Sequence, residues 1–360
     1  MKVNFNKIKD FFKNKKVVFA LVVIGILVLS GIFTAIRSPK EQYVLNDKVI
    51  EYKDKNLEKA IRDKLKKPFG DIYVHDVTSV KVIDLSKSDI RHLDGIEYMN
   101  SLETLNLSEN NIDDIEKLKD LKKLKNLFLG VNKIKDITPL KNLTNLEDLK
   151  LNNNSILDIS TIANFKGLIK LELSRNHIQD LTPLKDLTNL KELSVAYNGI
   201  GNVSVLYDLN SLTTLNIAGN NLSRLDGVEK LVNITEINIS DNIISDLTNL
   251  QPLTSLKKID ASNNRLESID QLKPLVNLEF LSVARNFISN VNVIENFKNL
   301  EVLSVVDTYV KDVSVVKKLS KINELYLDKY TDRSSVNDLY GKLKNADVYT
   351  KSEILNKEIF

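Results

Sequence analysis

The sequence predicts an α/β solenoid in which short parallel strands form a concave sheet and 3₁₀ turns form a narrow convex side. Asparagines recur at intervals of 22 residues, and each one ends the same apolar frame, L-x-x-L-x-L-x-x-N. The second half of each unit carries an apolar residue at every third position. This pattern is typical of a right-handed leucine-rich-repeat solenoid. The nine asparagines are Asn110, Asn132, Asn154, Asn176, Asn198, Asn220, Asn242, Asn264 and Asn286.

The N-terminal segment predicts a membrane anchor before the repeats. Residues 17–36 contain no charge, and as a helix they would span the roughly 30 Å of bilayer hydrocarbon. Residues 1–16 carry six lysines, whereas only Arg37 and Lys40 closely follow the apolar run. The positive-inside rule then places residues 1–16 in the cytoplasm and the repeats outside the cell membrane, after a linker at 37–52. The alternative is cleavage as a signal peptide, followed by secretion.

The repeats are expected to have a cap at each end. Residues 53–79 predict a helical N-terminal cap, because Leu57, Ile61 and Leu65 form a one-sided apolar stripe. About twelve units of 22 residues follow at 80–333, with Ser88 and Tyr330 in place of the asparagine at the two ends. Residues 334–360 predict a C-terminal cap, made of an amphipathic helix at 335–346 and a strand that begins at Asp347.

Within each unit, two leucines that are two residues apart point to one face of a strand, and the residues between them point outward. The leucines therefore face the core. The asparagine follows the strand, where its amide can donate to and accept from the adjoining backbone, so we assign it a structural role. Period-three spacing such as Ile134, Ile137 and Leu140 favours 3₁₀ turns, and prolines such as Pro139 and Pro183 agree with this.

Composition and motifs disfavour several classes of function. The chain has no cysteine, and its three histidines have no partners at metal-ligand spacing. It has no phosphate-binding glycine loop and no G-x-S-x-G motif, so we predict no enzyme, no cofactor and no metal. Residues 1–16 carry a net charge of +5, which leaves −2 on the rest of the chain, and this nearly neutral balance disfavours nucleic-acid binding.

The outward positions suggest where a protein partner would bind. In the middle of the array they carry charges that alternate between neighbouring strands, as in Asp148, Lys170 and Glu192, and these predict a solvated face with cross-strand ion pairs. Towards the C-terminus the same columns hold an apolar cluster, which is a candidate binding patch unless it only reflects strand propensity. The patch consists of Phe280, Val302, Val306 and Tyr326, flanked by Arg285 and Tyr309. A secondary candidate set is Arg175 beside Tyr197, together with Phe128.

Two repeats, DITPLKNLTNLEDLKLNNNSI and DLTPLKDLTNLKELSVAYNGI, resemble the 22-residue repeats of bacterial internalins and related surface proteins of Gram-positive bacteria. The resemblance covers residues 53–330 and includes DKNLEKAIRDKLKKPFGDIYVHDV, which is similar to the cap before such repeats. It implies surface display and protein binding through the concave face, in adhesion or in recognition of a host or cell surface. The immunoglobulin-like region and cell-wall sorting signal of internalins do not follow the repeats, which keeps a scaffold for a protein of the cell's own envelope as the alternative. The identity of the protein ligand is left open.

Overall fold

The structure is a computed structural model that describes residues 47–328, 331 and 347–350. Contacts divide the chain into two compact units. One contains Asp71–Asp76 together with residues 47–50, where the amide of Ile50 donates to the carbonyl of Ile72 at 2.8 Å. The other contains Glu51–Gly70 and the chain from Val77 onward, and it holds all of the repeats.

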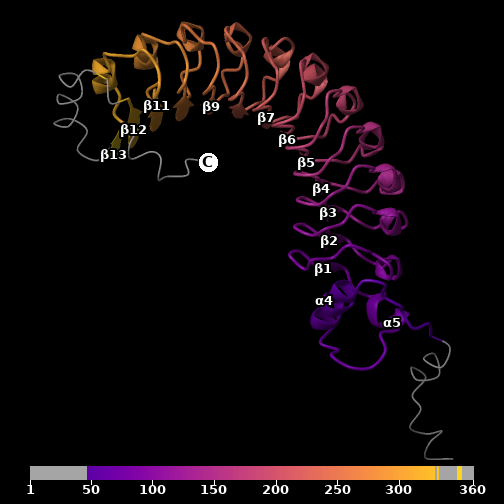
Figure 1. The fold of residues 1–360 in the computed structure, drawn as a ribbon. Coiled ribbons are helices and arrows are strands. Elements are labelled where there is room, and N and C mark those ends of the chain that lie inside the picture. Colours follow the sequence, from indigo (N-terminus) through magenta and orange to yellow (C-terminus); the bar gives the residue numbers. More distant parts are fainter. Residues whose placement is uncertain (1–46, 329–330, 332–346, 351–360) are drawn as a thin grey trace, which may run out of the picture. The chain divides into compact units, whose positions relative to one another are not determined.

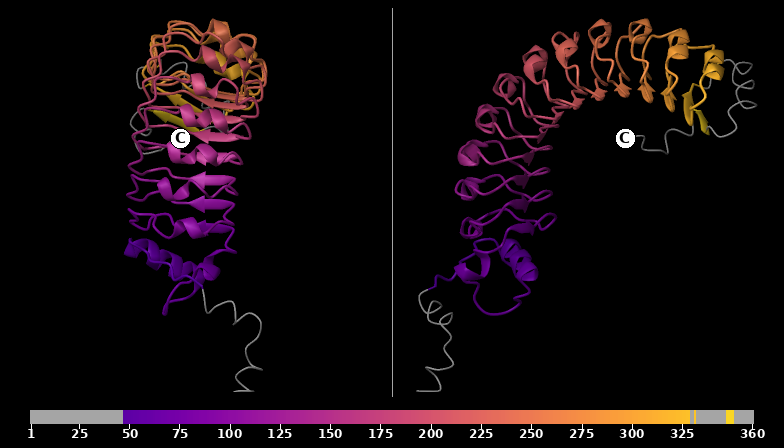
Figure 2. Two further views of the ribbon diagram at one scale, coloured as in Figure 1. Left: turned by 90° about the vertical axis from the view of Figure 1, so that its right-hand side faces the viewer. Right: turned by 180° about the vertical axis from the view of Figure 1, so that it is seen from behind.

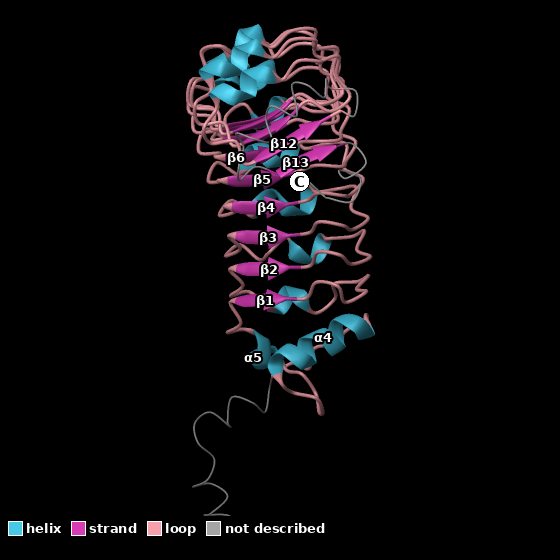
Figure 3. Cartoon of the chain, turned by 90° about the vertical axis from the view of Figure 1, so that its left-hand side faces the viewer, coloured by secondary structure: helices cyan, strands magenta, loops and turns pink. Residues whose placement is uncertain are grey.

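A parallel sheet runs through the compact unit that contains the repeats. Its thirteen strands in the described residues follow one another in chain order. Figure 3 shows the strands stacked edge to edge. From β1 to β11 each strand pairs with the next one at an offset of 22 residues, as in Leu105↔Leu127, so the leucine columns are in register, and β12 pairs with β13 at an offset of 23. The strands are β1 Val82–Asp84, β2 Thr104–Asn106, β3 Asn126–Phe128, β4 Asp148–Lys150, β5 Lys170–Glu172, β6 Glu192–Ser194, β7 Thr214–Asn216, β8 Glu236–Asn238, β9 Lys258–Asp260, β10 Phe280–Ser282, β11 Val302–Ser304, β12 Glu324–Leu327 and β13 Asp347–Thr350.

Short 3₁₀ helices form the opposite side of each repeat, so the strands line the inner side of the arc of repeats (Figures 1 and 2). The 3₁₀ helices follow an isoleucine, leucine or valine, except for two that follow Gly95 and Gly227. They contain i→i+3 bonds, as from the amide of Leu140 to the carbonyl of Ile137 at 3.0 Å. The solenoid with a parallel sheet is therefore confirmed. The 3₁₀ helices are Ile96–Tyr98, Glu116–Leu118, Thr138–Asn142, Ser160–Asn164, Thr182–Leu184, Ser204–Asp208, Val228–Lys230, Thr248–Leu250, Asp270–Leu272, Asn292–Asn296 and Ser314–Lys318.

The core is a column of leucine, isoleucine and valine side chains that lies between the sheet and the 3₁₀ turns. Residues such as Leu127, Leu149 and Leu215 are at most 1% exposed. The side chains of the recurring asparagines form hydrogen bonds with the backbone of the turn beside this core. The side-chain amide of Asn220 donates to three carbonyls, those of Val195, Ile217 and Ala218, at 3.0–3.2 Å. Its Oδ1 accepts from the backbone of Ile200 in the preceding unit at 3.1 Å. Each asparagine therefore joins two neighbouring units.

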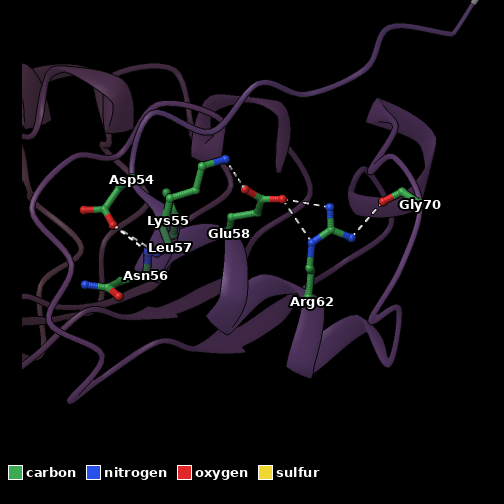
Figure 4. Close-up of polar contacts among 7 residues, drawn as sticks. All are labelled: Asp54, Lys55, Asn56, Leu57, Glu58, Arg62 and Gly70. Carbon is green, nitrogen blue, oxygen red and sulfur yellow. Dashed lines mark hydrogen bonds and ion pairs between the residues drawn. The ribbon is translucent and has the colours of Figure 1, made fainter.

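A helical segment precedes the first strand in the compact unit that contains the repeats. Helix α4, Lys55–Leu65, buries Leu57 and Ile61 completely. Asp54 caps it, because one carboxylate oxygen accepts from the amides of Asn56 and Leu57 (Figure 4). Glu58 accepts from Arg62 one turn later at 2.7 Å, and Arg62 also donates to the carbonyl of Gly70 (Figure 4). A second helix, α5, spans Val74–Val77.

The predicted fold class also placed a single transmembrane helix before the repeats, and that part of the prediction is corrected. No helix in residues 47–328, 331 and 347–350 is long and apolar enough to cross a bilayer. The longest one, α4, has 11 residues. At 1.5 Å per residue it extends about 16 Å, about half of the hydrocarbon thickness. Residues 17–36 and the C-terminal helix expected at 335–346 lie outside the described residues.

Candidate binding groove on the concave sheet

In the middle of the concave sheet the charges are partly paired. Lys170 forms an ion pair with Glu192 at 2.7 Å, and Lys258 pairs with Glu236 at 2.9 Å. Asp148 departs from the expected cross-strand pairing, because its Oδ1 is buried without a hydrogen-bond partner in the described residues. Burial raises the pKa of its carboxyl group. This part of the sheet is a largely neutralised polar surface.

A groove of about 510 Å³ lies on the sheet towards the C-terminal repeats. Its floor follows the last residue of five consecutive strands, β7 to β11. One side is formed by Phe280 and Val302 at the start of their strands, and Tyr326 and Val306 close the C-terminal end. The opposite side follows the turn after each strand. The floor residues are Asn216, Asn238, Asp260, Ser282 and Ser304, and the turn residues are Tyr197, Asp241, Asn263 and Arg285.

The groove brings together most of the residues of the predicted patch, but their exposure differs from the expectation. Phe280 and Val302 are partly exposed, whereas Tyr326 is only 1% exposed and Val306 only 8%. The hydroxyl of Tyr326 donates to the carboxylate of Glu324 on the same strand. Phe280 and Val302 are therefore the apolar side chains of the patch that a partner can reach within the groove.

Tyr197, from the secondary candidate set, also lines this groove. Its ring lies against the guanidinium of Arg175, whose Cζ is 4.5 Å from the ring centroid. Its hydroxyl donates to Asp241 at 2.6 Å, two units further on. This bond raises the pKa of Tyr197, and burial adds to the effect. Gly219 lies between them at φ +61°, and a Cβ there would be only 2.2 Å from the tyrosine ring. A glycine is thus required for the ring to cross this unit.

Asp260 is the acidic residue of the groove floor, and it was not among the residues predicted for the site. It is 6% exposed, and its Oδ1 accepts from the amide of Ser262 at 3.0 Å and from its hydroxyl at 2.7 Å. Burial raises the pKa of the Asp260 carboxyl group, and the neighbouring charge of Asp241 raises it further. The one available signal was an aspartate at a position that holds asparagine or serine in the two units on either side.

Three of the predicted residues do not line the groove, and Arg175, which contacts it only through Tyr197, is one of them. Tyr309 is 64% exposed and stacks on Phe287, with ring centroids 6.3 Å apart. Phe128 lies on β3, where the ammonium of Lys150 is 5.1 Å from its ring centroid. Arg285, which was placed at the edge of the patch, does line the groove and forms a long ion pair with Asp307 at 3.8 Å.

Side chains that could bind a metal are dispersed in the part of the chain that the structure describes. No group of three or more histidine, cysteine, aspartate or glutamate side chains there is arranged to hold a metal ion. The recurring aspartates accept hydrogen bonds from the first residues of the 3₁₀ helices, as where Asp136 accepts from the amide of Thr138 at 2.8 Å. The arrangement offers hydrogen bonds, charge and apolar contact along an open surface, which suits binding.

Family models of leucine-rich repeats match the chain. The model of paired copies matches residues 122–164, 166–208 and 210–252, and the single-repeat model matches residues 101–121. The comparison with curated proteins gave no match.

Several solved structures have the same fold. The crystal structure of an internalin (inlF) from Listeria monocytogenes is 30% identical, with a TM-score of 0.76 over 82% of this chain and 88% of that one. An internalin C2 from the same species is 29% identical over 58% of this chain and 93% of its own, with a TM-score of 0.56. A leucine-rich-repeat protein of Leptospira interrogans, at 18% identity and a TM-score of 0.60 over 77% of this chain and 85% of its own, shares the fold.

Leucine-rich-repeat solenoids present an extended concave surface for protein interaction, and such folds are typically non-enzymatic. The repeats, the asparagine spacing and the match to nearly the whole length of the first internalin agree with one another. The chain therefore belongs to the internalin-like leucine-rich-repeat proteins.

Proposed function

We propose that this chain is an extracytoplasmic binding module that recognises a protein through the groove on its concave sheet. The observation that carries the proposal is the partly exposed Phe280 beside Val302, on one side of a groove whose floor is otherwise polar. An aromatic anchor within a polar surround is the usual composition of a protein-binding hot spot. The fold supports this reading, because solenoids use their concave surface for binding.

The first test is photo-crosslinking in intact cells from a reactive residue placed at position 280, with position 172 as the control. Glu172 is also partly exposed on the concave sheet, but it lies on β5 and does not line the groove. We expect a defined product from position 280 and none from position 172. Equal products from the two positions, or no product under any condition, contradict the proposal.

The same experiment distinguishes the two roles that the sequence left open. A product with a protein of the producing cell's own envelope supports a scaffold. A product that requires added foreign cells or proteins supports adhesion or recognition of another surface. Protease added to intact cells tests the location, because repeats displayed outside the cytoplasm are accessible to it and repeats inside are not.

A matched pair of variants tests the role of the phenylalanine. Phe280→Glu places a charge beside the groove, whereas Phe287→Glu makes the same change on a 50% exposed aromatic of the same repeat outside it. For the crosslinked partner, we expect Phe280→Glu to weaken affinity at least tenfold and Phe287→Glu to change it less than twofold. Unchanged affinity in Phe280→Glu, with the circular dichroism spectrum preserved, removes the groove from the proposal.

A further inference from the structure

We propose that the groove receives an extended segment of the partner protein, with a lysine or arginine side chain seated between Asp241 and Asp260. This inference rests on the proposed function and adds the chemistry of what is bound. Three features of the groove carry it: the atoms that its floor presents, the charge of its acidic residues, and the apolar side next to them.

The floor presents hydrogen-bonding atoms in a fixed order. At the end of β8, the Oδ1 of Asn238 turns back to accept from the amide of Ser240 at 2.9 Å, and Asn216 does the same with Ala218 at 3.2 Å. Each acceptor oxygen thereby has one lone pair engaged within the turn, and the amide NH₂ groups are the donors that these side chains offer at the floor. The next residue in the row, Asp260, uses the same turn but carries a carboxylate. The row therefore changes from donors to an acceptor at Asp260.

An extended chain matches this row better than a helix does. Five neighbouring parallel strands at about 4.8 Å spacing cover about 19 Å, which corresponds to about six residues of extended chain. An extended segment has free backbone carbonyls and amides that need partners, whereas those of a helix are bonded internally. The amides of Asn216 and Asn238 and the hydroxyl of Ser304, all lining the groove, are suited to such backbone groups.

Charge selects a basic side chain for the acidic part of the groove. Within the described residues, no lysine or arginine lies within 4.0 Å of Asp241 or Asp260, whereas Glu192 and Glu236 on the same sheet are paired. Arg285, the cation that lines the groove, is directed to Asp307 at 3.8 Å. A carboxylate held away from water without a counter-charge is unfavourable, and a bound ammonium or guanidinium group relieves that cost.

The apolar side suits the rest of such a side chain. Phe280 lies one strand beyond Asp260, so the methylene groups of a lysine or arginine seated at the carboxylates would reach its ring and Val302. The charged end of an arginine can also stack on an aromatic face, as Arg175 already does on Tyr197. The groove is thus complementary to a basic residue that has an apolar neighbour.

The test uses random heptapeptides displayed on phage and selected on the full-length protein. We expect lysine or arginine to be enriched at one position next to an apolar residue. Selected peptides are then synthesised and titrated by calorimetry against Asp260→Asn and against Asp120→Asn, which makes the same charge change at an exposed site outside the groove. We expect Asp260→Asn to weaken binding at least tenfold and Asp120→Asn to change it less than twofold.

Folding is controlled within the same experiment. Because burial raises the pKa of Asp260, the folded state binds the proton more tightly than the unfolded state, and this carboxylate reduces stability above that pKa. Asp260→Asn can keep the bond from Ser262 and should melt at the same or a higher temperature at neutral pH. Lost binding in Asp260→Asn together with retained melting then reports on recognition.

Three results overturn the inference: selection without basic residues, selection of acidic ones, or full affinity in Asp260→Asn. None of these affects the proposed function if Phe280→Glu still weakens binding of the crosslinked partner at least tenfold. Conversely, an unaffected partner in Phe280→Glu rejects the proposed function and the inference that rests on it.

Discussion

At the scale of single residues, the recurring asparagine has the clearest physical role. Asn220 is 6% exposed and makes five hydrogen bonds to the backbone, including those from the amides of Asn198 and Ile200. Replacing it with alanine leaves several buried backbone groups unpaired, so we expect Asn220→Ala to lower the free energy of unfolding by about 2–4 kcal/mol. Denaturant unfolding measures this. Asn221→Ala, at an exposed neighbour, should change it by less than about 0.5 kcal/mol, and equal effects would contradict the assignment.

Gly219 gives a second prediction at this scale. An alanine there is strained at φ +61° and displaces the ring of Tyr197, which breaks the bond to Asp241. We expect Gly219→Ala to destabilise the protein by about 1–2 kcal/mol. Gly201→Ala is the control, because no atom lies within 4 Å of a Cβ at that position. In a double-mutant cycle, Tyr197→Phe should cost stability in the wild type but nothing in Gly219→Ala, and an additive cycle would show that the ring had not moved.

At the scale of elements, Asp54 connects helix α4 to the first repeat. One oxygen caps the helix, and the other accepts from the amides of Arg91 and His92 at 2.6 and 3.0 Å. Burial alone would raise the pKa of Asp54, but the four amide donors outweigh it and lower the pKa below 3.8. We expect Asp54→Ala to cost about 1–3 kcal/mol at neutral pH, measured by denaturant unfolding.

The pH dependence of this contribution has a definite sign. A lowered pKa in the folded state means that the contribution is fully present above about pH 4–5 and disappears as the pH falls through the folded pKa. The stability difference between the wild type and Asp54→Ala should therefore narrow in acid. Asp63→Asn, at an exposed position of the same helix, should show no such narrowing, and a constant difference for Asp54→Ala would argue against the assigned bonds.

At the scale of the whole molecule, stability is distributed along a one-dimensional array. Most contacts of a unit are with its two neighbours, so opening a central unit breaks two interfaces, whereas opening a terminal unit breaks fewer. We expect amide hydrogen exchange to be slowest in β6, β7 and β8 and faster in β1 and β12. Exchange followed by mass spectrometry, with rates normalised to the unfolded chain, measures this. Uniform protection along the array would indicate a single cooperative unit.

The sequence by itself determined the repeat, the register and the direction of each side chain, because these follow from a period of 22 residues and from the alternation of a strand. It placed Phe280 and Val302 on the concave sheet, and it predicted that the side chains of Asn220 and the equivalent asparagines form hydrogen bonds with the backbone. It also assigned a transmembrane helix to the fold class, and this was wrong for the described residues, where no helix is long and apolar enough to cross a bilayer.

Only the tertiary structure decided which outward residues belong to one groove. Periodicity relates equivalent positions in neighbouring units, whereas the groove depends on side chains that reach across units and on the left-handed turns after the strands. Tyr197 contacts Asp241 because Gly219 leaves space between them, and this contact could not be predicted from the 22-residue spacing. For the same reason the sequence did not reveal that Tyr326 is buried, that Tyr309 lies outside the groove, or that Asp260 is a buried carboxylate at its floor. Burial and charge pairing are set by packing in three dimensions, and here they define the groove.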